Sequence, residues 1–317
     1  MLRSHRVRVL LLLLLVGPAR AFQLRNHPAV ARQGFRGSLP LHAPVTRAEL
    51  WTATFIHSSI PVGARLRAPA VSMGPIAGAP PFVRDVSVAL LLLSTSAIWI
   101  RVCTALSEAG YISSSDSRKL VHVGSGPFFV LAWPLFSRTA SGQIAATAVP
   151  VLSVFRLLAA SRAKQGSTLV KAVSRTGDSR EALGGPMLYT YVLLASALFG
   201  WTSVIPLIAI CQMAVGDGMA DIIGRRFGRT KWPFAFAERK SVEGSLAFAG
   251  SAFVACLATL KVFYLAGMTT MTATSAAPAL LAISVLCAIV ELLPLGDDNI
   301  TVPAAAALLS LLLLPTC

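Results

Sequence analysis

The sequence predicts an all-α protein that crosses a membrane with about seven or eight transmembrane helices. Of its 317 residues, 55% are hydrophobic and only 13% are charged, whereas soluble domains carry roughly 25% charged residues. The mean hydropathy is +0.70. The apolar residues form continuous runs and do not alternate with polar ones, as they would in the strands of a closed barrel. An ordinary soluble domain is therefore excluded.

The first 75 residues have the composition of a targeting sequence. Residues 1–21 contain a basic start, the nine-residue apolar run 9–17 and then small residues, which is the pattern of a secretory signal. The run is too short to cross a bilayer, which takes about 20 residues. Residues 22–75 are rich in arginine, lack lysine and are nearly free of acids, as transit peptides are. This arrangement resembles the bipartite presequences of algae with secondary plastids, and predicts import into a plastid membrane; a plain secretory signal is the alternative.

The remaining residues, 83–317, are expected to form one integral membrane domain. Its apolar runs predict helices at 85–106, 121–136, 142–160, 186–202, 203–220, 242–267, 279–295 and 301–314. Several of these runs are shorter than the roughly 20 residues that a span normally takes. The five cysteines are scattered singly without a CxxC spacing, so the sequence indicates neither a disulfide framework nor a zinc site.

Charge gives the expected orientation of these helices. If each run crosses once, four segments share one side of the membrane: 107–120, 161–185, 221–241 and 296–300. These segments carry 13 basic residues, while the opposite side has little beyond Arg84 and Arg138. The positive-inside rule places the basic side toward the compartment of synthesis, or the stroma in a plastid. Nucleotides are found on that side.

Residues 211–245 contain the densest group of polar side chains. Asp217 and Asp221 are four residues apart, so a helix presents both carboxylates on one face, and paired carboxylates with phosphate oxygens are a usual way to hold Mg²⁺. Lys240 precedes the predicted start of a helix, and the N-terminus of a helix is a favourable binding position for phosphate. The candidate phosphate-binding residues around them are Gly218, Gly224, Arg225, Arg226, Gly228, Arg239, Ser241 and Gly244. This order predicts a phosphate–metal site; the alternative is a basic loop with an acid pair that serves helix packing.

Three other polar stretches fall on the same predicted side. Arg118, Lys119 and His122 open one span. Arg118 and Lys119 are further candidate phosphate-binding residues, and His122 is either a general base or phosphate contact or a hydrogen-bonded structural group. A Gly/Ser/Arg-rich loop covers 174–189. The third stretch contains Glu291, inside an apolar run, and the triplet Asp297, Asp298 and Asn299, for which a simple turn is the alternative. We regard these acids as secondary site candidates.

These motifs resemble those of the phytol/farnesol kinase family, within the wider dolichol-kinase-like group. The sequences DGMADIIGRRFG (217–228) and RKSVEGS (239–245) resemble its nucleotide-binding signature. Residues 118–137, 177–186 and 297–303 resemble the family's first, middle and last conserved blocks. The resemblance implies transfer of a phosphoryl group from CTP or UTP, with Mg²⁺, to an isoprenoid alcohol; in plastids this would be phytol, and phytyl phosphate would feed tocopherol synthesis. Val242 stands where the family commonly has an aromatic residue, which leaves the donor base open.

The physical chemistry of phosphoryl transfer agrees with this resemblance, because the reaction depends mostly on positioning and charge neutralisation. Asp217 and Asp221 would hold Mg²⁺, Lys240 with Arg225 and Arg226 would offset developing charge, and the base would be His122 or Asp298. The sequence has no GxxxxGK[ST] motif and no protein-kinase signature.

Two other functions fit part of the pattern. One is a membrane CTP:phosphatidate cytidylyltransferase, and the other is a cation-coupled transporter, which would place its acids near the span midpoints. The N-terminal arginines are not interleaved with aromatic residues, so we expect no nucleic-acid partner. The sequence leaves the oligomeric state open.

Overall fold

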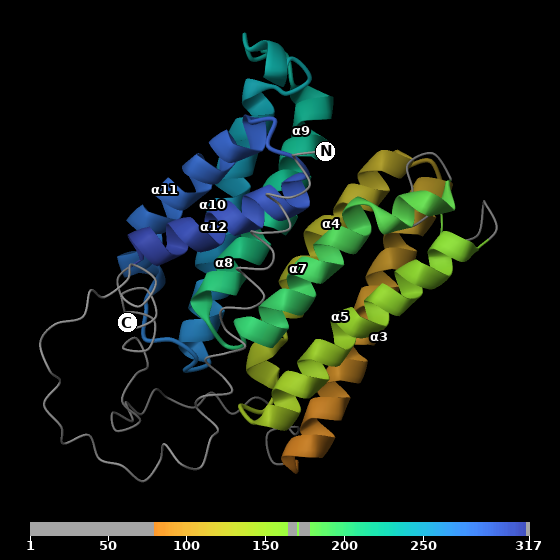
Figure 1. Ribbon diagram of the computed structural model, residues 1–317, viewed down its shortest axis with the longest axis vertical. Helices are drawn as coiled ribbons and strands as arrows, with labels where there is room; N and C mark the ends of the chain where they lie inside the picture. Colours follow the sequence, from red (N-terminus) through yellow and green to blue (C-terminus); the bar gives the residue numbers. More distant parts are fainter. Residues whose placement is uncertain (1–78, 164–169, 171–177, 315–317) are drawn as a thin grey trace, which may run out of the picture. The chain divides into compact units, whose positions relative to one another are not determined.

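The computed structural model describes residues 79–163, 170 and 178–314. The predicted presequence therefore lies outside the described residues. Within the described ranges, helices joined by turns and loops make up the chain, and the one β-type pairing is an isolated bridge between Lys231 and Ser241. The prediction of an all-α protein is confirmed, and Figure 1 shows the helices running side by side.

Each of the predicted apolar runs overlaps a helix. The longer helices are α3 (Pro81–Glu108), α4 (Ser114–Leu131), α5 (Ala140–Arg162), α7 (Gly185–Phe199), α8 (Val204–Cys211), α9 (Asp217–Phe227), α10 (Val242–Leu265), α11 (Ala273–Leu292) and α12 (Asp298–Leu313). Short 3₁₀ helices cover Trp133–Leu135, Ser179–Leu183 and Ala235–Ala237, and a π-helical turn, Gln212–Gly216, joins α8 to α9.

Several helices begin earlier than their apolar runs because polar side chains cap them. The Ser113 side chain accepts a hydrogen bond from the Asp116 amide and starts α4 seven residues before the predicted position. Thr272 caps α11 through the Ser275 amide in the same way. Capping satisfies amides that the first turn of a helix leaves unpaired, so the polar residue before a helix, and not the first apolar one, sets its start.

Among the described residues, six helices are long and apolar enough to cross a membrane: Pro81–Glu108, Ala140–Arg162, Ser179–Phe199, Val204–Phe227, Val242–Leu265 and Ala273–Leu292. The predicted number of seven or eight was thus approximate. The two further helices are α4, whose first half is polar, and α12, which is apolar but shorter.

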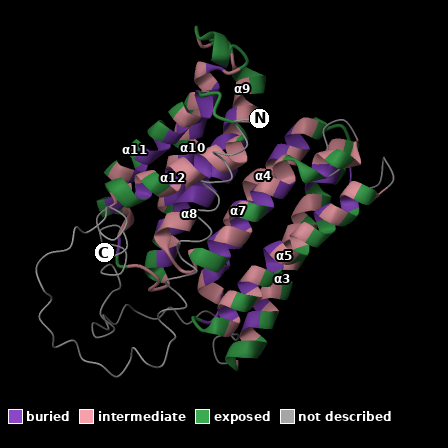
Figure 2. Cartoon of the chain, viewed as in Figure 1, coloured by how far each residue is buried: buried purple, intermediate pink, exposed green. Residues whose placement is uncertain are grey.

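The span Val204–Phe227 lies at the centre of the bundle. In its most apolar window 72% of the residues are buried by the rest of the chain, against 17% in the span that α3 forms. Figure 2 shows the contrast, with buried residues along α8 and exposed ones along α3. The central span packs against α4 and α10, and α10 in turn packs against α11. Because Asp217 belongs to this span, its surroundings are set by helices from both halves of the described chain.

Candidate functional site

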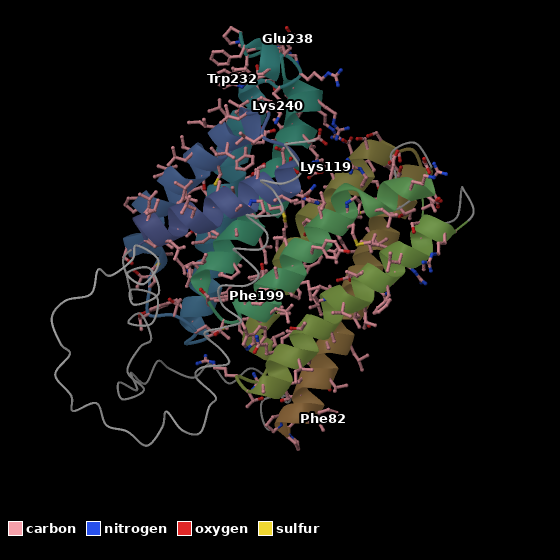
Figure 3. All side chains as sticks on the ribbon, in the orientation of Figure 1. Phe82, Lys119, Phe199, Trp232, Glu238 and Lys240 are labelled. Atoms are coloured by element: carbon pink, nitrogen blue, oxygen red, sulfur yellow. The ribbon has the colours of Figure 1, made fainter. Side chains whose placement is uncertain are left out.

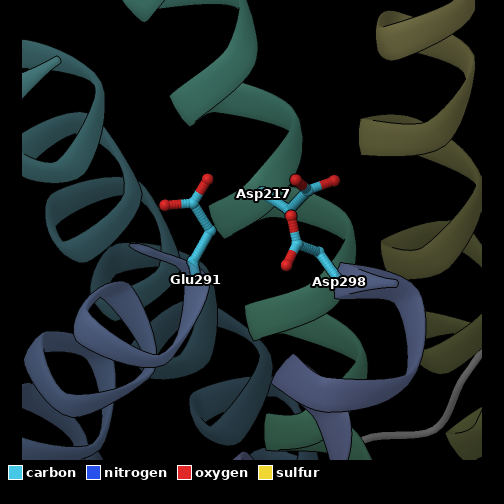
Figure 4. Close-up of side chains that lie close together, drawn as sticks. All are labelled: Asp217, Glu291 and Asp298. Atoms are coloured by element: carbon cyan, nitrogen blue, oxygen red, sulfur yellow. The ribbon is translucent and has the colours of Figure 1, made fainter. Parts of the chain in front are cut away.

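Three carboxylates from three helices converge at one end of the bundle. Asp217 begins α9, Glu291 lies in the last turn of α11 and Asp298 begins α12. One oxygen from each lies within 4.8 Å of the other two, and Figure 4 shows the three side chains facing one another. Asp217 and Glu291 are nearly buried, whereas Asp298 is more open. Like charges this close repel one another unless cations lie between or beside them.

Two lysines supply positive charge to this cluster. Lys119 Nζ of α4 lies 2.8 Å from Asp217 Oδ2. Lys240 Nζ lies 2.8 Å from Glu291 Oε1 and 3.5 Å from Asp298 Oδ2, and it also donates to the Glu291 carbonyl. Burial alone would lower the pKa of Lys240, but the neighbouring Glu291 and Asp298 carboxylates raise that pKa above its usual value. Lys240 therefore stays protonated at neutral pH.

The π-helical turn before α9 sets the position of Asp217. Such turns insert an extra residue into a helix and occur often at functional sites. Gln212, which opens the turn, is fully buried and donates to Ser284 Oγ at 2.8 Å. Just after Asp217, a Cβ atom on Gly218 would lie 2.3 Å from a Val123 methyl group of α4. Glycine at this position therefore lets α4 approach α9 closely enough for Lys119 to reach Asp217.

The other predicted phosphate-binding glycines lie where α9 and α10 meet. Ser241 is buried and caps α10 by accepting from the Gly244 amide at 3.1 Å. A Cβ atom on Gly228 would lie 2.5 Å from Ser241 Oγ, and one on Gly244 would lie 3.0 Å from the Ala220 carbonyl oxygen. Gly224 borders the same contact. These residues thus have a packing role, and their predicted contact with phosphate stays a prediction.

Asp221 has a different environment from Asp217. Its carboxylate pairs with Arg225 of the same helix at 3.0 Å and lies 3.9 Å from Lys119 Nζ. Arg225 also contacts Asp116 at 3.1 Å, and Arg226 contacts Asp116 at 2.8 Å. The structure therefore brings Asp217 together with Glu291 and Asp298, and ties Asp221 to arginine.

Sequence reasoning missed Asp116, which joins α4 to the end of α9. Its signal was its place in the sequence: it is an acid in the first turn after a serine cap, just before the basic pair at 118–119.

His122 borders the carboxylate cluster. Its Nε2 atom lies 3.1 Å from the Met213 carbonyl oxygen and 3.7 Å from Asp217 Oδ2. Its ring packs on Tyr189 of α7 with centroids 4.2 Å apart. The carbonyl contact gives His122 the structural hydrogen bond that was one of its two predicted roles. Arg118 lies in the same turn of α4.

The remaining candidates belong to the helix ends around the cluster. Asp297 caps α12 by accepting from the Asn299 amide at 2.9 Å, and the Asn299 side chain donates to Asp297 at 2.8 Å. The turn predicted as the alternative for this triplet is therefore present, with Asp298 turned into the cluster. Gly185, which belongs to the polar stretch 174–189 and begins α7, lies beside Asn299. Arg239 is exposed in the loop before α10.

Curated relatives share most of the length of this chain. A probable chloroplastic phytol kinase of Triticum aestivum is 38% identical over 236 residues, which are 73% of this chain and 78% of the relative. Phytol kinase 1, chloroplastic, of Arabidopsis thaliana is 36% identical over 231 residues, 71% and 75% of the two chains. Farnesol kinase, chloroplastic, of the same plant is 37% identical over 213 residues, 66% and 68% of the two chains.

The chain belongs to the phytol/farnesol kinase family. The family resemblance found in the motifs is thus confirmed over a range that far exceeds them. No protein-family model matches the chain, and no solved structure matches it. The chloroplastic relatives of the family, together with six helices that fit membrane spans, are consistent with a plastid membrane protein.

Proposed function

We propose that this chain transfers the terminal phosphoryl group of a nucleoside triphosphate, CTP or UTP, to phytol or a related isoprenoid alcohol. A bond forms between the alcohol oxygen and the γ-phosphorus, the bond from that phosphorus to the β-phosphate oxygen breaks, and the nucleoside diphosphate leaves. Membership of the phytol/farnesol kinase family supports the reaction class. The main structural support for this assignment is that the carboxylates of Asp217, Glu291 and Asp298 converge beside two lysines.

The carboxylate cluster fits a divalent cation. Carboxylate oxygens are the ligands that Mg²⁺ prefers, and three of them lie within 4.8 Å of one another. We therefore favour a ligand set of Asp217, Glu291 and Asp298. The pair Asp217 and Asp221 is less suited to hold the metal, because Asp221 is already paired with Arg225. When bound, Mg²⁺ would neutralise charge on the donor phosphates.

The two lysines are proposed to hold the donor phosphates. Lys119, on α4, and Lys240, just before α10, each pair with a carboxylate of the cluster, so each can exchange part of its ion pair for a phosphate oxygen. Arg225 and Arg226 are tied to Asp116 and would act from farther out. Fixed cations aimed at developing negative charge are the main source of rate in this chemistry.

The alcohol proton needs an acceptor near the same place. His122 and Asp298 are the two candidates. Asp298 is the most open carboxylate of the cluster, and because it is also a proposed Mg²⁺ ligand, its role as base would use the oxygen that does not hold the metal. His122 Nε2 is already within hydrogen-bond distance of the Met213 carbonyl, which fixes a proton on that nitrogen. The pH–rate profile of His122→Gln distinguishes the two, because Asp298→Asn would also remove a proposed Mg²⁺ ligand. An acidic limb that is kept in His122→Gln supports Asp298, and an acidic limb that is lost supports His122.

The cluster lies where a membrane-dissolved alcohol can present its hydroxyl to water-borne nucleotide. It sits at the helix ends, while the apolar helix surfaces below can accommodate a long chain. Phytol is the favoured alcohol, and phytyl phosphate made in a plastid membrane would enter tocopherol synthesis. The bipartite presequence is the proposed route to that membrane.

The test supplies membranes containing the full chain with Mg²⁺, an alcohol and γ-labelled CTP, UTP or ATP in parallel. Phytol, farnesol and geranylgeraniol are compared. Label in an organic-soluble prenyl monophosphate, absent with α-labelled donor, supports the proposal and identifies donor and acceptor together. No lipid label with any pair would overturn it, and α-label appearing in lipid with phosphatidate present would indicate a cytidylyltransferase instead.

A further inference from the structure

The loop 228–241, which joins α9 to α10, presents a ladder of aromatic rings. Trp232 and Phe234 are stacked with centroids 6.1 Å apart, and Phe234 and Phe236 are stacked at 5.3 Å with an angle of 2° between their planes. Phe234 is 46% exposed and Phe236 is 52% exposed. Burying such rings against water-free surroundings is strongly favourable, so exposed and ordered rings indicate a surface that meets something apolar.

The same loop is positively charged. Arg229, Lys231 and Arg239 are exposed, and within the described part of the chain none of the three has an ion-pair partner. Glu238 is the one acid of the loop. We call residues 229–239 the aromatic–basic loop; they exclude Lys240 of the carboxylate cluster. Its unpaired cations favour a partner that carries negative charge.

The position of the loop matches the edge of a membrane. It lies just beyond the spans Val204–Phe227 and Val242–Leu265, and Figure 3 shows Trp232 and Glu238 at the end of the bundle opposite Phe82. Trp232 Nε1 donates to Ser245 Oγ in the first turns of α10 at 3.1 Å. The next residue of α10, Leu246, is 68% exposed, as expected for a side chain that faces lipid. The ladder is therefore continuous with the apolar surface of a membrane span.

We propose that the aromatic–basic loop lies in the headgroup layer of the membrane and binds anionic lipids there. Tryptophan and other aromatic side chains concentrate at this depth because one end of the ring is apolar and the other polar. Each basic residue near an anionic surface strengthens binding about fivefold. A nucleotide base is a weaker match, because the rings of Phe234 and Phe236 already cover each other and Trp232 is turned onto α10.

The inference is independent of the reaction proposed above, so its test does not use activity. The full chain is reconstituted into vesicles of phosphatidylcholine and phosphatidylglycerol, one of which carries brominated acyl chains that quench tryptophan. The difference in emission between the wild type and Trp232→Phe isolates Trp232. We expect Trp232 to be quenched by brominated lipid and protected from aqueous iodide. Quenching should be stronger when the bromine is on phosphatidylglycerol than on phosphatidylcholine at equal mole fraction.

The anionic preference is assigned to the loop by charge variants. In Arg229→Gln with Lys231→Gln, the preference for brominated phosphatidylglycerol should fall by about fivefold for each charge removed. The matched control is Lys261→Gln, which removes an exposed charge near the other end of α10 and should leave the preference unchanged. Quenching by iodide but not by lipid would overturn the proposal, and so would lipid quenching without anionic preference. If the emission of Trp232 responds to CTP with Mg²⁺ and not to brominated lipid, the loop binds a nucleotide and the lipid proposal is wrong.

Discussion

Both ends of the helix bundle bury carboxylates, and they do so in different ways. At the end far from the candidate site, Asp85 is 1% exposed. It accepts hydrogen bonds of 2.6 Å from the Ser137 amide, the Ser137 hydroxyl and the Ser141 hydroxyl. Its neighbour Arg84 donates to three backbone carbonyls, of which the Leu135 oxygen is 2.6 Å away. These neutral partners satisfy the hydrogen bonding of Asp85 and Arg84. The two side chains therefore have a structural role, which is to hold α3 against the segment that leads into α5.

At the site end, the carboxylates depend on other charges. Asp217 is balanced by Lys119, and Glu291 with Asp298 is balanced by Lys240. Ammonium groups on flexible stems can exchange one anion for another, whereas the amide and hydroxyl donors around Asp85 are held by the fold. The comparison indicates which buried charges serve folding and which are available to a ligand.

Replacement of Asp217 should reduce activity more than any other single change. Asp217→Asn keeps the shape of the side chain but removes a charge from the carboxylate cluster and leaves Lys119 without its nearest partner. We expect turnover to fall by about a thousandfold or more, because charge stabilisation at the reacting phosphate is lost. The measurement is labelled prenyl phosphate per amount of inserted protein. Activity within tenfold of the wild type would contradict the site.

Lys240→Gln should have the next largest effect. The variant removes the cation that balances Glu291 and Asp298 and that is proposed to hold donor phosphate. We expect turnover to fall by about a hundredfold. Steady-state kinetics across donor concentrations checks this, and Lys261→Gln provides the control for loss of a lysine elsewhere. A rate equal to that of the control would exclude Lys240 from the site.

Asp85→Asn tests the opposite end. Loss of the charge weakens three hydrogen bonds to a buried group, which should lower the free energy of unfolding by about 2 kcal/mol. Thermal unfolding in detergent measures this change. Turnover at low temperature should stay near that of the wild type, and a large loss of turnover in a protein that remains folded would mean that this end takes part in the reaction.

Asp221→Asn tests whether the two carboxylates of α9, Asp217 and Asp221, have different roles. Because Asp221 is partly exposed and paired with Arg225, we expect turnover to fall by about tenfold or less, in line with the small value of exposed ion pairs. The same assay as for Asp217→Asn applies. A loss equal to that of Asp217→Asn would favour the pair Asp217 and Asp221 as the metal ligands.

The sequence was sufficient to predict the helices and to select the candidate residues that meet at one end of the bundle. Long apolar runs determine the spans, and the spacing of basic segments determines which helix ends share a side. Asp217, Lys240, Glu291 and Asp298 were all candidates on those grounds.

The contacts between these residues could not be predicted from local pattern. The approach of Glu291 and Asp298 to Asp217 depends on how α11 and α12 pack against the central span, and the π-helical turn at Gln212–Gly216 sets the direction of Asp217. The structural role of Asp85 could not be predicted either, because its partners Ser137 and Ser141 lie more than fifty residues away in the sequence.

The most direct test compares the two ends in one experiment. Membranes with equal amounts of the wild type, Asp217→Asn and Asp85→Asn receive phytol, Mg²⁺ and γ-labelled CTP, with UTP and ATP in parallel, and label in phytyl monophosphate is measured at low temperature. We expect label from the wild type and Asp85→Asn with a common donor, and almost none from Asp217→Asn. Label retained by Asp217→Asn and lost from a folded Asp85→Asn protein would contradict this expectation.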